Sequence, residues 1–321
     1  MRTIQLYGRL PDQDMQALEG QLIDESSFDL LVDGPEDTTV MLPTMEPLFI
    51  VRRHVVSPGM VQAMLPSFRR AAKEGDLTNR GMAVGKGSSQ PTLKKDGTLS
   101  NTNRVNTKAL PHLLNERGEV VSTGNIVGYM DAGTRFPACR LTAFAARQTS
   151  HWKWMQQYAQ LASKVFQENN PDRYAVQRDW AERTTQDWII PGTCFTTMTV
   201  NRNWQTAVHQ DKGDLVQGCG VMGVIGNDHY QGLYFTYPRY RVACALRSGD
   251  IIVNNVHEWH ANTPVHNAAP GWERISIVLY YREHMLYCAT RTEEQQKMED
   301  FLNTHPTARS YMGRKAEDGS T

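Results

Sequence analysis

The chain has 321 residues, of which 40% are hydrophobic and 21% are charged. This composition is typical of globular proteins and excludes a chain that is disordered throughout. The length suits one domain of catalytic size with extensions. No apolar run reaches the roughly 20 residues of a membrane span, and the start MRTIQLYGRLPDQD lacks the apolar segment of a signal peptide. We therefore expect a soluble, cytoplasmic protein with no membrane partner.

The net charge of zero hides an uneven distribution along the chain. Residues 1–50 carry 2 basic and 10 acidic residues, a net charge of −8, whereas residues 51–150 carry 15 basic and 6 acidic residues, a net charge of +9. A basic surface is typical of proteins that bind polyanions. An acidic leader folded against the basic segment, or a solvated helix face, explains the pattern equally well. The candidate phosphate-binding side chains are Arg69, Arg70, Lys73, Arg80, Lys86, Lys94 and Lys95.

The cysteines are odd in number, far apart and without a CxxC pair. We therefore expect neither a disulfide framework nor a thiolate zinc site, and a reducing compartment fits best. The five are Cys139, Cys194, Cys219, Cys244 and Cys288.

The segment from Gly75 to Lys108 is rich in Gly, Ser, Thr, Asn and Lys. It has too little apolar content to form core, so we expect a long mobile loop that acts as a lid or a DNA clamp. Its fragment GMAVGKGSS is no phosphate-binding loop, because the glycine spacing is one residue short of GxxxxGK[ST] and a glycine follows the lysine. This argues against a nucleoside triphosphatase.

Two helices are expected next. From His151 to Glu168, apolar and aromatic residues recur at three- and four-residue steps, with Ser150 as the expected N-cap. A second helix is expected to begin at Pro171 and to run past Trp180.

After Gly192 the sequence consists of short β-rich segments divided by Gly, Pro and Asn turns. Seven or eight strands in about ninety residues predict a sandwich or a barrel. A polar helix is expected over residues 292–302, followed by a disordered tail from residue 305. We thus divide the chain into an N-terminal extension (1–127), a core with supporting helices (128–290) and a C-terminal helix with a tail (291–321).

Three residues of the β-rich part form a candidate metal site. His209 and Asp211 lie two apart at the end of a β-type segment, so both side chains share one face. His260, in NNVHEWHANTPV, would complete a triad of two histidines and one carboxylate, a set that suits Fe(II). His257 competes for this role, but it lies three residues from His260, and only one of the two can face the cavity of a regular strand. We favour His260.

Arg274 begins the next predicted strand, RISIVLYYR, where an inward guanidinium would bind a carboxylate through two hydrogen bonds. Ser276 would share its face and add a hydroxyl donor. A metal triad with such a clamp is what 2-oxoglutarate requires, because its keto acid end chelates iron and its far carboxylate needs a fixed cation. A structural salt bridge is the alternative role for Arg274.

These residues resemble the TET/JBP dioxygenases, which group the 5-methylcytosine oxidases with the thymine hydroxylases. The resemblance covers roughly Gly128 to Glu283 and rests on NRNWQTAVHQDKGD, CGVMGVIG, RSGDIIVNNVHEWHANTPV and WERISIVLYYRE, with GYMDAGTRFPACRLTAF similar to the JBP side. The HQDK segment also resembles the AlkB repair dioxygenases. The resemblance implies an α+β fold: a double-stranded β-helix, the cupin-like jelly roll, flanked by helices from the N-terminal half.

Position by position, the resemblance implies iron ligands at His209, Asp211 and His260, the last standing before Ala-x-Thr-Pro. It implies 2-oxoglutarate contacts at Arg274 and Ser276, and at Asn201, for which a strand-edge turn is the alternative. The implied substrate contacts are Tyr280 beside the target base, Asp214 and Arg282, with Arg140 as a further candidate that is as well explained as a structural residue.

Two of these positions depart from the cytosine-oxidising members, which carry a base-contacting His where this chain has Arg282, and Asn where it has Asp214. A carboxylate accepts the N3–H of thymine but repels the bare N3 of cytosine unless it is protonated. Asp214 therefore favours thymine, with 5-methylcytosine still allowed; a solvated loop residue is the alternative.

The expected reaction hydroxylates the 5-methyl group of a pyrimidine in DNA, with Fe(II), 2-oxoglutarate and O₂. The base would be flipped out or already single-stranded, and no protein partner is evident. A short member of the family fits a phage or bacterial modification system. The alternatives are an AlkB-like N-demethylase, an oxygenase of free nucleotides, and a non-catalytic DNA-binding module.

Overall fold

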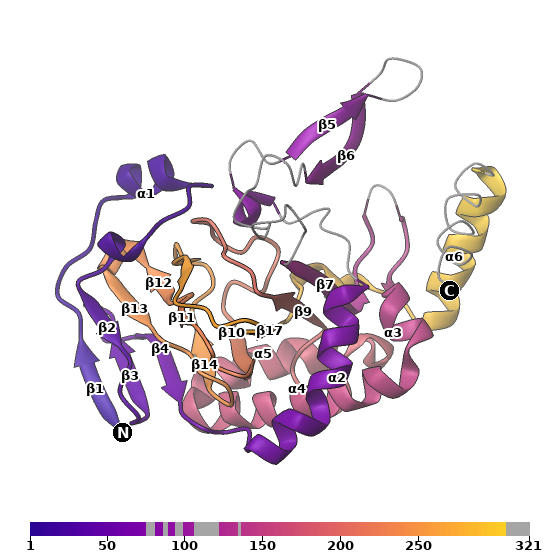
Figure 1. The fold of residues 1–321 in the computed structure, drawn as a ribbon. Coiled ribbons are helices and arrows are strands. Elements are labelled where there is room, and N and C mark those ends of the chain that lie inside the picture. Colours follow the sequence, from indigo (N-terminus) through magenta and orange to yellow (C-terminus); the bar gives the residue numbers. More distant parts are fainter. Residues whose placement is uncertain (75–80, 86–88, 94–98, 106–121, 134–135, 306–321) are drawn as a thin grey trace.

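The core of the computed structural model is a pair of β-sheets, with helices packed on the outer face of the larger one (Figure 1). One apolar cluster lies between the sheets and joins, among others, Phe49, Val224, Tyr237 and Val242. A second, larger cluster lies between the large sheet and the helices. The described residues are 1–74, 81–85, 89–93, 99–105, 122–133 and 136–305.

The large sheet has nine strands, and its neighbouring strands are antiparallel except for the parallel outer pair β1 and β3. Strand β17 is held on both sides, by β10 and by β9, so it is a rigid central element. In spatial order the strands are β1 (Arg2–Gln5), β3 (Thr38–Met41), β4 (Pro47–Arg52), β14 (Ile251–Asn254), β10 (Gly220–Gly226), β17 (Arg274–Tyr280), β9 (Thr197–Arg202), β7 (Thr123–Met130) and β8 (Arg140–Leu141).

The smaller sheet has four strands. One of them, β2, comes from the acidic leader (residues 1–50) and pairs in parallel with β13. Its order is β15 (Ala261–Asn262), β12 (Phe235–Tyr237), β13 (Val242–Cys244) and β2 (Leu30–Val32), and a short ladder joins β11 (Gln231–Gly232) to β16 (Val265–His266). The leader therefore contributes strands to both sheets, where its apolar residues are buried.

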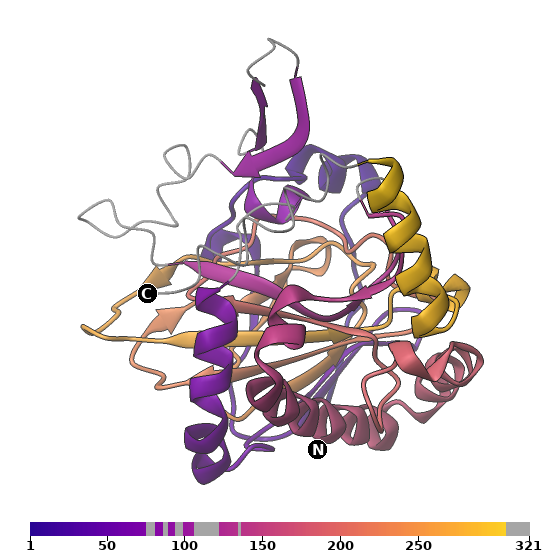
Figure 2. The same ribbon diagram turned by 90° about the vertical axis from the view of Figure 1, so that its right-hand side faces the viewer.

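The helices lie largely on one side of the large sheet, as Figures 1 and 2 show together. Their apolar stripes explain this, because Met155, Tyr158 and Phe166 of one helix and Phe68 of another are buried against the sheet. The six are α1 (Asp12–Leu18), α2 (Pro58–Lys73), α3 (Ala143–Arg147), α4 (Thr149–Asn169), α5 (Pro171–Arg183) and α6 (Arg291–Thr304). None of the described helices is long and apolar enough to cross a membrane.

The expected jelly-roll fold class is confirmed, and the helices expected near 151–168, 171–180 and 292–302 are present. The expected cap was wrong, because Ser150 lies inside α4 and the N-cap position is Gln148, whose side chain makes no capping hydrogen bond. The segment 75–108, expected as a long mobile loop, contains the hairpin β5 (Ser89–Leu93) and β6 (Leu99–Val105), which projects away from the sheets in Figure 2. The tail from residue 306 lies outside the described residues.

The expectation that no cysteines pair was also wrong. Cys139 and Cys288 form a disulfide with their Cα atoms 5.8 Å apart, although 149 residues separate them in the sequence. The fold brings them together because Cys139 directly precedes β8 while Cys288 follows the short helix η7 (Glu283–Tyr287) at the end of β17. The other three cysteines are free and buried.

Candidate active site

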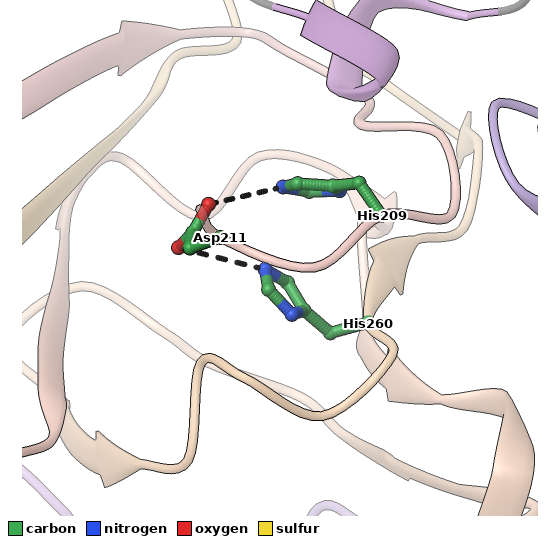
Figure 3. Close-up of side chains that lie close together, drawn as sticks. All are labelled: His209, Asp211 and His260. Carbon is green, nitrogen blue, oxygen red and sulfur yellow. Dashed lines mark ion pairs between the residues drawn. The ribbon is translucent and has the colours of Figure 1, made fainter. Parts of the chain in front are cut away.

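Three side chains expected to bind a metal converge on one another (Figure 3), and all three line a cavity between the sheets. One potential ligand atom from each of His209, Asp211 and His260 lies within 4.8 Å of the others. The Asp211 carboxylate lies 3.6 Å from His209 Nε2 and 3.9 Å from His260 Nε2. These separations exceed a hydrogen bond, so the three groups face a common point rather than bond to one another.

The backbone explains why the two imidazoles lie side by side. His209 and His260 form an isolated antiparallel bridge in which each N–H donates to the other's carbonyl at 3.0 Å, and their ring centroids are 4.3 Å apart. Each Nδ1 contacts a backbone carbonyl, of Ala207 at 2.7 Å and of Glu258 at 2.8 Å. Because a carbonyl only accepts, Nδ1 carries the proton in both rings, and both Nε2 lone pairs remain available for a metal ion.

The electrostatics favour the same protonation state. His260 is 4% exposed, and burial, aided by the neighbouring His209, lowers its pKa to about 4. The ring is therefore neutral at physiological pH, which is the form that binds metal.

His257 lies outside this cluster, and its Nε2 lies 3.1 Å from the carbonyl of Leu215. The residues between Asn254 and His260 form a turn rather than the regular strand assumed for the choice between the two histidines. Two imidazoles and one carboxylate, without sulfur, are a donor set that fits Fe(II) and leaves coordination positions for other ligands. The residues present therefore fit the metal.

The cavity beside the triad has a volume of about 450 Å³ and receives side chains from both sheets. This size suits a small-molecule cosubstrate with room for part of a larger substrate. Among the lining residues, Asn201 and Ser276 face each other across the β9–β17 register, and Asn201 Oδ1 is buried without a hydrogen-bond partner in the part of the chain that the structure describes.

Arg274 lies on the same face of β17 as Ser276, two residues before it, and is 2% exposed. Its Nε and Nη2 atoms have no hydrogen-bond partner among the described residues. Burial lowers the pKa of its guanidinium, an effect that Tyr230 and Asp228 partly offset. Arginine remains charged in proteins, so two donor atoms of this buried cation meet no acceptor within the described part of the chain. The arrangement fits the far carboxylate of 2-oxoglutarate.

Three expected substrate contacts line the cavity near the C-terminal end of β17. Tyr280 is 7% exposed and its hydroxyl lies 3.1 Å from Thr199 Oγ1. Asp214 forms an isolated bridge with Arg282, and burial, followed by the charge of Asp211, raises the pKa of its carboxyl well above the usual range.

The Arg282 side chain is fixed by a residue that the sequence did not single out. Arg282 Nε donates to the Asp131 carboxylate at 2.5 Å, and the Asp131 side chain is only 10% exposed. Asp131 follows β7 directly, and nothing in its local sequence signals that it meets a residue 151 positions later.

Arg140 and the described members of the basic cluster, which were also expected to contact ligands, do not line the cavity. Arg140 donates to the carbonyl of Asp131 at 3.2 Å, lies 4.4 Å over the ring of Phe136, and is not a lining residue. In the basic cluster, Arg69 pairs with Glu273 at 2.7 Å and Arg70 pairs with Glu74, so part of that charge is neutralised. Four other members of the cluster lie outside the described residues: Arg80, Lys86, Lys94 and Lys95.

Comparison with known proteins gives a family match within the chain. Residues 125–283 match the model of Tet_JBP, the oxygenase domain of the 2OGFeDO superfamily. The bifunctional helicase and thymine dioxygenase JBP2 of Trypanosoma brucei brucei is 34% identical over 164 residues, which are 50% of this chain and 15% of that protein. Thymine dioxygenase JBP1 of the same organism is 32% identical over 170 residues, 51% of this chain and 20% of that protein. The chain thus matches only a minor part of these relatives.

A solved structure, NgTET1 in complex with 5mC DNA, has a TM-score of 0.54 and 10% sequence identity, covering 91% of this chain and 100% of that chain. At this identity the likeness supports the fold alone, and the fold agrees with the jelly-roll core described above.

Proposed function

Because residues 125–283 are an oxygenase domain of the TET/JBP family, we propose that this protein hydroxylates the 5-methyl group of pyrimidines in DNA. The cofactors of the superfamily are Fe(II), 2-oxoglutarate and O₂. The observation that carries the proposal is the order of groups along the cavity. Along β17, the buried Arg274 comes first, Ser276 and Val278 follow as lining residues of the cavity, and Tyr280 lies at the far end beside the Asp214–Arg282 pair; the metal triad lines the same cavity.

His209, Asp211 and His260 would hold the metal ion. When bound, Fe(II) together with 2-oxoglutarate and O₂ supplies the oxidant that converts a C–H bond of the methyl group into C–OH. The contacts of both Nδ1 atoms with backbone carbonyls keep the two rings in place and in the tautomer that binds metal.

Arg274, Ser276 and Asn201 would orient the cosubstrate. The guanidinium is preorganised on a strand paired on both sides, so binding of a carboxylate needs little rearrangement. The same carboxylate would satisfy the buried donors of Arg274, which the described residues leave without an acceptor.

Tyr280, Asp214 and Arg282 would receive the base. A methyl group inside a duplex lies far from a buried metal, so the pyrimidine must be flipped out or supplied in a single strand. Tyr280 offers an aromatic surface for stacking, and Arg282 offers donors for a carbonyl oxygen of the base. An ionised Asp214 accepts from N3–H of thymine, whereas a protonated one donates to N3 of cytosine. We propose thymine as the preferred base, because Arg282 donates to a carbonyl at C4 but clashes with an amine there.

The test is mass spectrometry of nucleosides from thymine- and 5-methylcytosine-containing DNA, single- and double-stranded, after incubation with protein, Fe(II), 2-oxoglutarate and ascorbate. We expect a gain of one oxygen on the methyl base. Unchanged DNA despite succinate formation would move the substrate to free nucleotides or to another class. Release of formaldehyde from N-methylated DNA would favour the AlkB-like alternative.

Asp211→Ala separates an enzyme from a DNA-binding module. We expect this variant to keep its fold and its affinity for DNA while losing turnover. Wild-type protein that binds DNA without consuming 2-oxoglutarate would support the non-catalytic alternative.

A further inference from the structure

Towards the start of β17, beyond Ser276, the Arg274 guanidinium has polar neighbours that the sequence analysis did not single out. The chain leaves β10 at Gly226, opposite Arg274 in the register, and then runs through Asp228 and Tyr230 before β11 begins. This connection lies over the start of β17, because Asn227 N–H donates to the carbonyl of Glu273 at 3.2 Å. Tyr230 is thereby placed next to the Arg274 guanidinium.

Tyr230 is only 5% exposed, and its hydroxyl has no hydrogen-bond partner among the described residues. Its ring packs on Trp272 with the centroids 5.3 Å apart, which fixes the direction of the hydroxyl. Burial raises the pKa of Tyr230, and Arg274 offsets part of this rise, so the two groups are neighbours and the phenol stays protonated. A buried hydroxyl without an acceptor destabilises the fold, because the group has lost its hydrogen bonds to water, and a bound ligand can satisfy it.

The local charge points to an anion. Two guanidinium groups, of Arg274 and Arg247, and one carboxylate, of Asp228, interact here. The Asp228 carboxylate already accepts the Ser248 N–H at 3.0 Å, and Arg247 Nη1 is buried with no hydrogen-bond partner in the described ranges of the chain. The nearby Asp250 is neutralised by Arg53 at 2.7 Å. The cluster therefore has one positive charge in excess, which a single carboxylate would balance.

We propose that Tyr230 is a cosubstrate-binding residue whose hydroxyl donates a hydrogen bond to the far carboxylate of 2-oxoglutarate, the group held by Arg274 and Ser276. Arg247 adds a second positive charge at longer range. With the Tyr230 hydroxyl, the Arg274 donors and the Ser276 hydroxyl, the carboxylate has donors for both of its oxygens. The site thus discriminates a dicarboxylate from a 2-oxo monocarboxylate. The inference rests on the use of 2-oxoglutarate in the proposed function and not on DNA as the substrate.

The experiment compares two ligands that share the keto acid end and differ at the far end. Nickel-loaded protein, which does not turn over, is titrated by calorimetry with 2-oxoglutarate and with 2-oxopentanoate, where a methyl group replaces the far carboxylate. For Tyr230→Phe we expect the Kd for 2-oxoglutarate to rise about 10- to 100-fold, as for loss of a hydrogen bond to a charged group. The Kd for 2-oxopentanoate should stay within about twofold.

Tyr281→Phe is the matched control. Tyr281 is also buried, at 1% exposure, but its hydroxyl lies 2.6 Å from Thr184 Oγ1 and it faces the helices instead of the cavity. The Tyr281→Phe variant should leave the Kd values for 2-oxoglutarate and 2-oxopentanoate unchanged. Arg247→Gln should weaken 2-oxoglutarate binding less than Tyr230→Phe and should leave 2-oxopentanoate unaffected.

An unchanged Kd of Tyr230→Phe for 2-oxoglutarate would overturn the proposal. Equal weakening of both ligands would also overturn it, because the tyrosine would then support the metal end or the fold. If Tyr230→Phe weakens binding of 2-oxoglutarate alone but the wild-type protein leaves DNA unoxidised, the proposed substrate is refuted and the role of Tyr230 is supported.

Discussion

The ion pair of Asp131 with Arg282 gives the sharpest test of how the substrate end of the cavity is built. Its side chains are 10% and 23% exposed, and its hydrogen bond is 2.5 Å long. In Asp131→Asn the guanidinium loses its charged acceptor but keeps a neutral neighbour of the same size. Hydrogen bonds to charged groups contribute about 1.5–3 kcal/mol, and partial exposure reduces this contribution. We therefore expect the variant to lose about 1–2 kcal/mol of substrate-binding free energy, because Arg282 is no longer held in its orientation.

That loss corresponds to a rise of about 5- to 30-fold in the KM for DNA, because 1.4 kcal/mol is a factor of ten. The Kd for 2-oxoglutarate should not change, since Arg274 and Ser276 lie at the other end of β17. Steady-state kinetics with a methylated oligonucleotide, together with calorimetry of 2-oxoglutarate, measures both. The control is Asp179→Asn, which removes an exposed pair with Arg183 at 3.2 Å and should change neither value.

The reasoning fails if Asp131→Asn leaves the KM for DNA unchanged, or if it weakens DNA and 2-oxoglutarate alike. The first result would mean that Arg282 is positioned by its backbone alone, through its bridge with Asp214. The second would mean a general disturbance of the fold.

Three further predictions follow from single features. Asp214→Asn should shift the ratio of kcat/KM for thymine over 5-methylcytosine towards cytosine by about tenfold, measured by competition between the two bases in one oligonucleotide. Replacing Cys139 and Cys288 by serine should lower the free energy of unfolding by up to about 5 kcal/mol, the loop-closure entropy for a separation of 149 residues; an unchanged melting temperature would argue against the bond. For the metal-free protein, the pKa of His260 is about 4 in the folded state and about 6.5 when unfolded. The unfolded state therefore binds more protons between these values, and stability present above about pH 6.5 should fall by about 3 kcal/mol as the pH drops to about 4. Denaturant titrations at several pH values should show a smaller fall in His260→Gln.

The parts of the site that the sequence predicted depend on short-range geometry. Alternation along one strand places Arg274, Ser276 and Tyr280 on one face whatever the strand pairs with. The same rule worked less well for Asp211, which lies in a loop after the bridge of His209 with His260, so its position follows from the turn and not from a strand.

The parts that the sequence missed depend on contacts between distant segments. Strands β1 to β4 come from an acidic leader, and their places are set by β14 and β13, which lie about 200 residues later. The Cys139–Cys288 bond and the Asp131–Arg282 pair likewise join the β7–β8 connection to the end of β17. The hairpin β5–β6 was not predicted, because the low apolar content of residues 75–108 indicated a loop.

One strand connects the two ends of the cavity, and this has a consequence for catalysis. Residues of β17 that share a face recur about every 6.8 Å, so the side chains of Arg274, Ser276, Val278 and Tyr280 span about 20 Å in a fixed order. Ladders on both sides prevent this strand from slipping relative to the triad. In the proposed function, the far carboxylate of the cosubstrate and the plane of the base would therefore be held at a fixed separation. A cosubstrate one methylene longer or shorter than 2-oxoglutarate would keep only one of its two ends in place, so the rigidity of β17 selects the length of the cosubstrate as well as its charge.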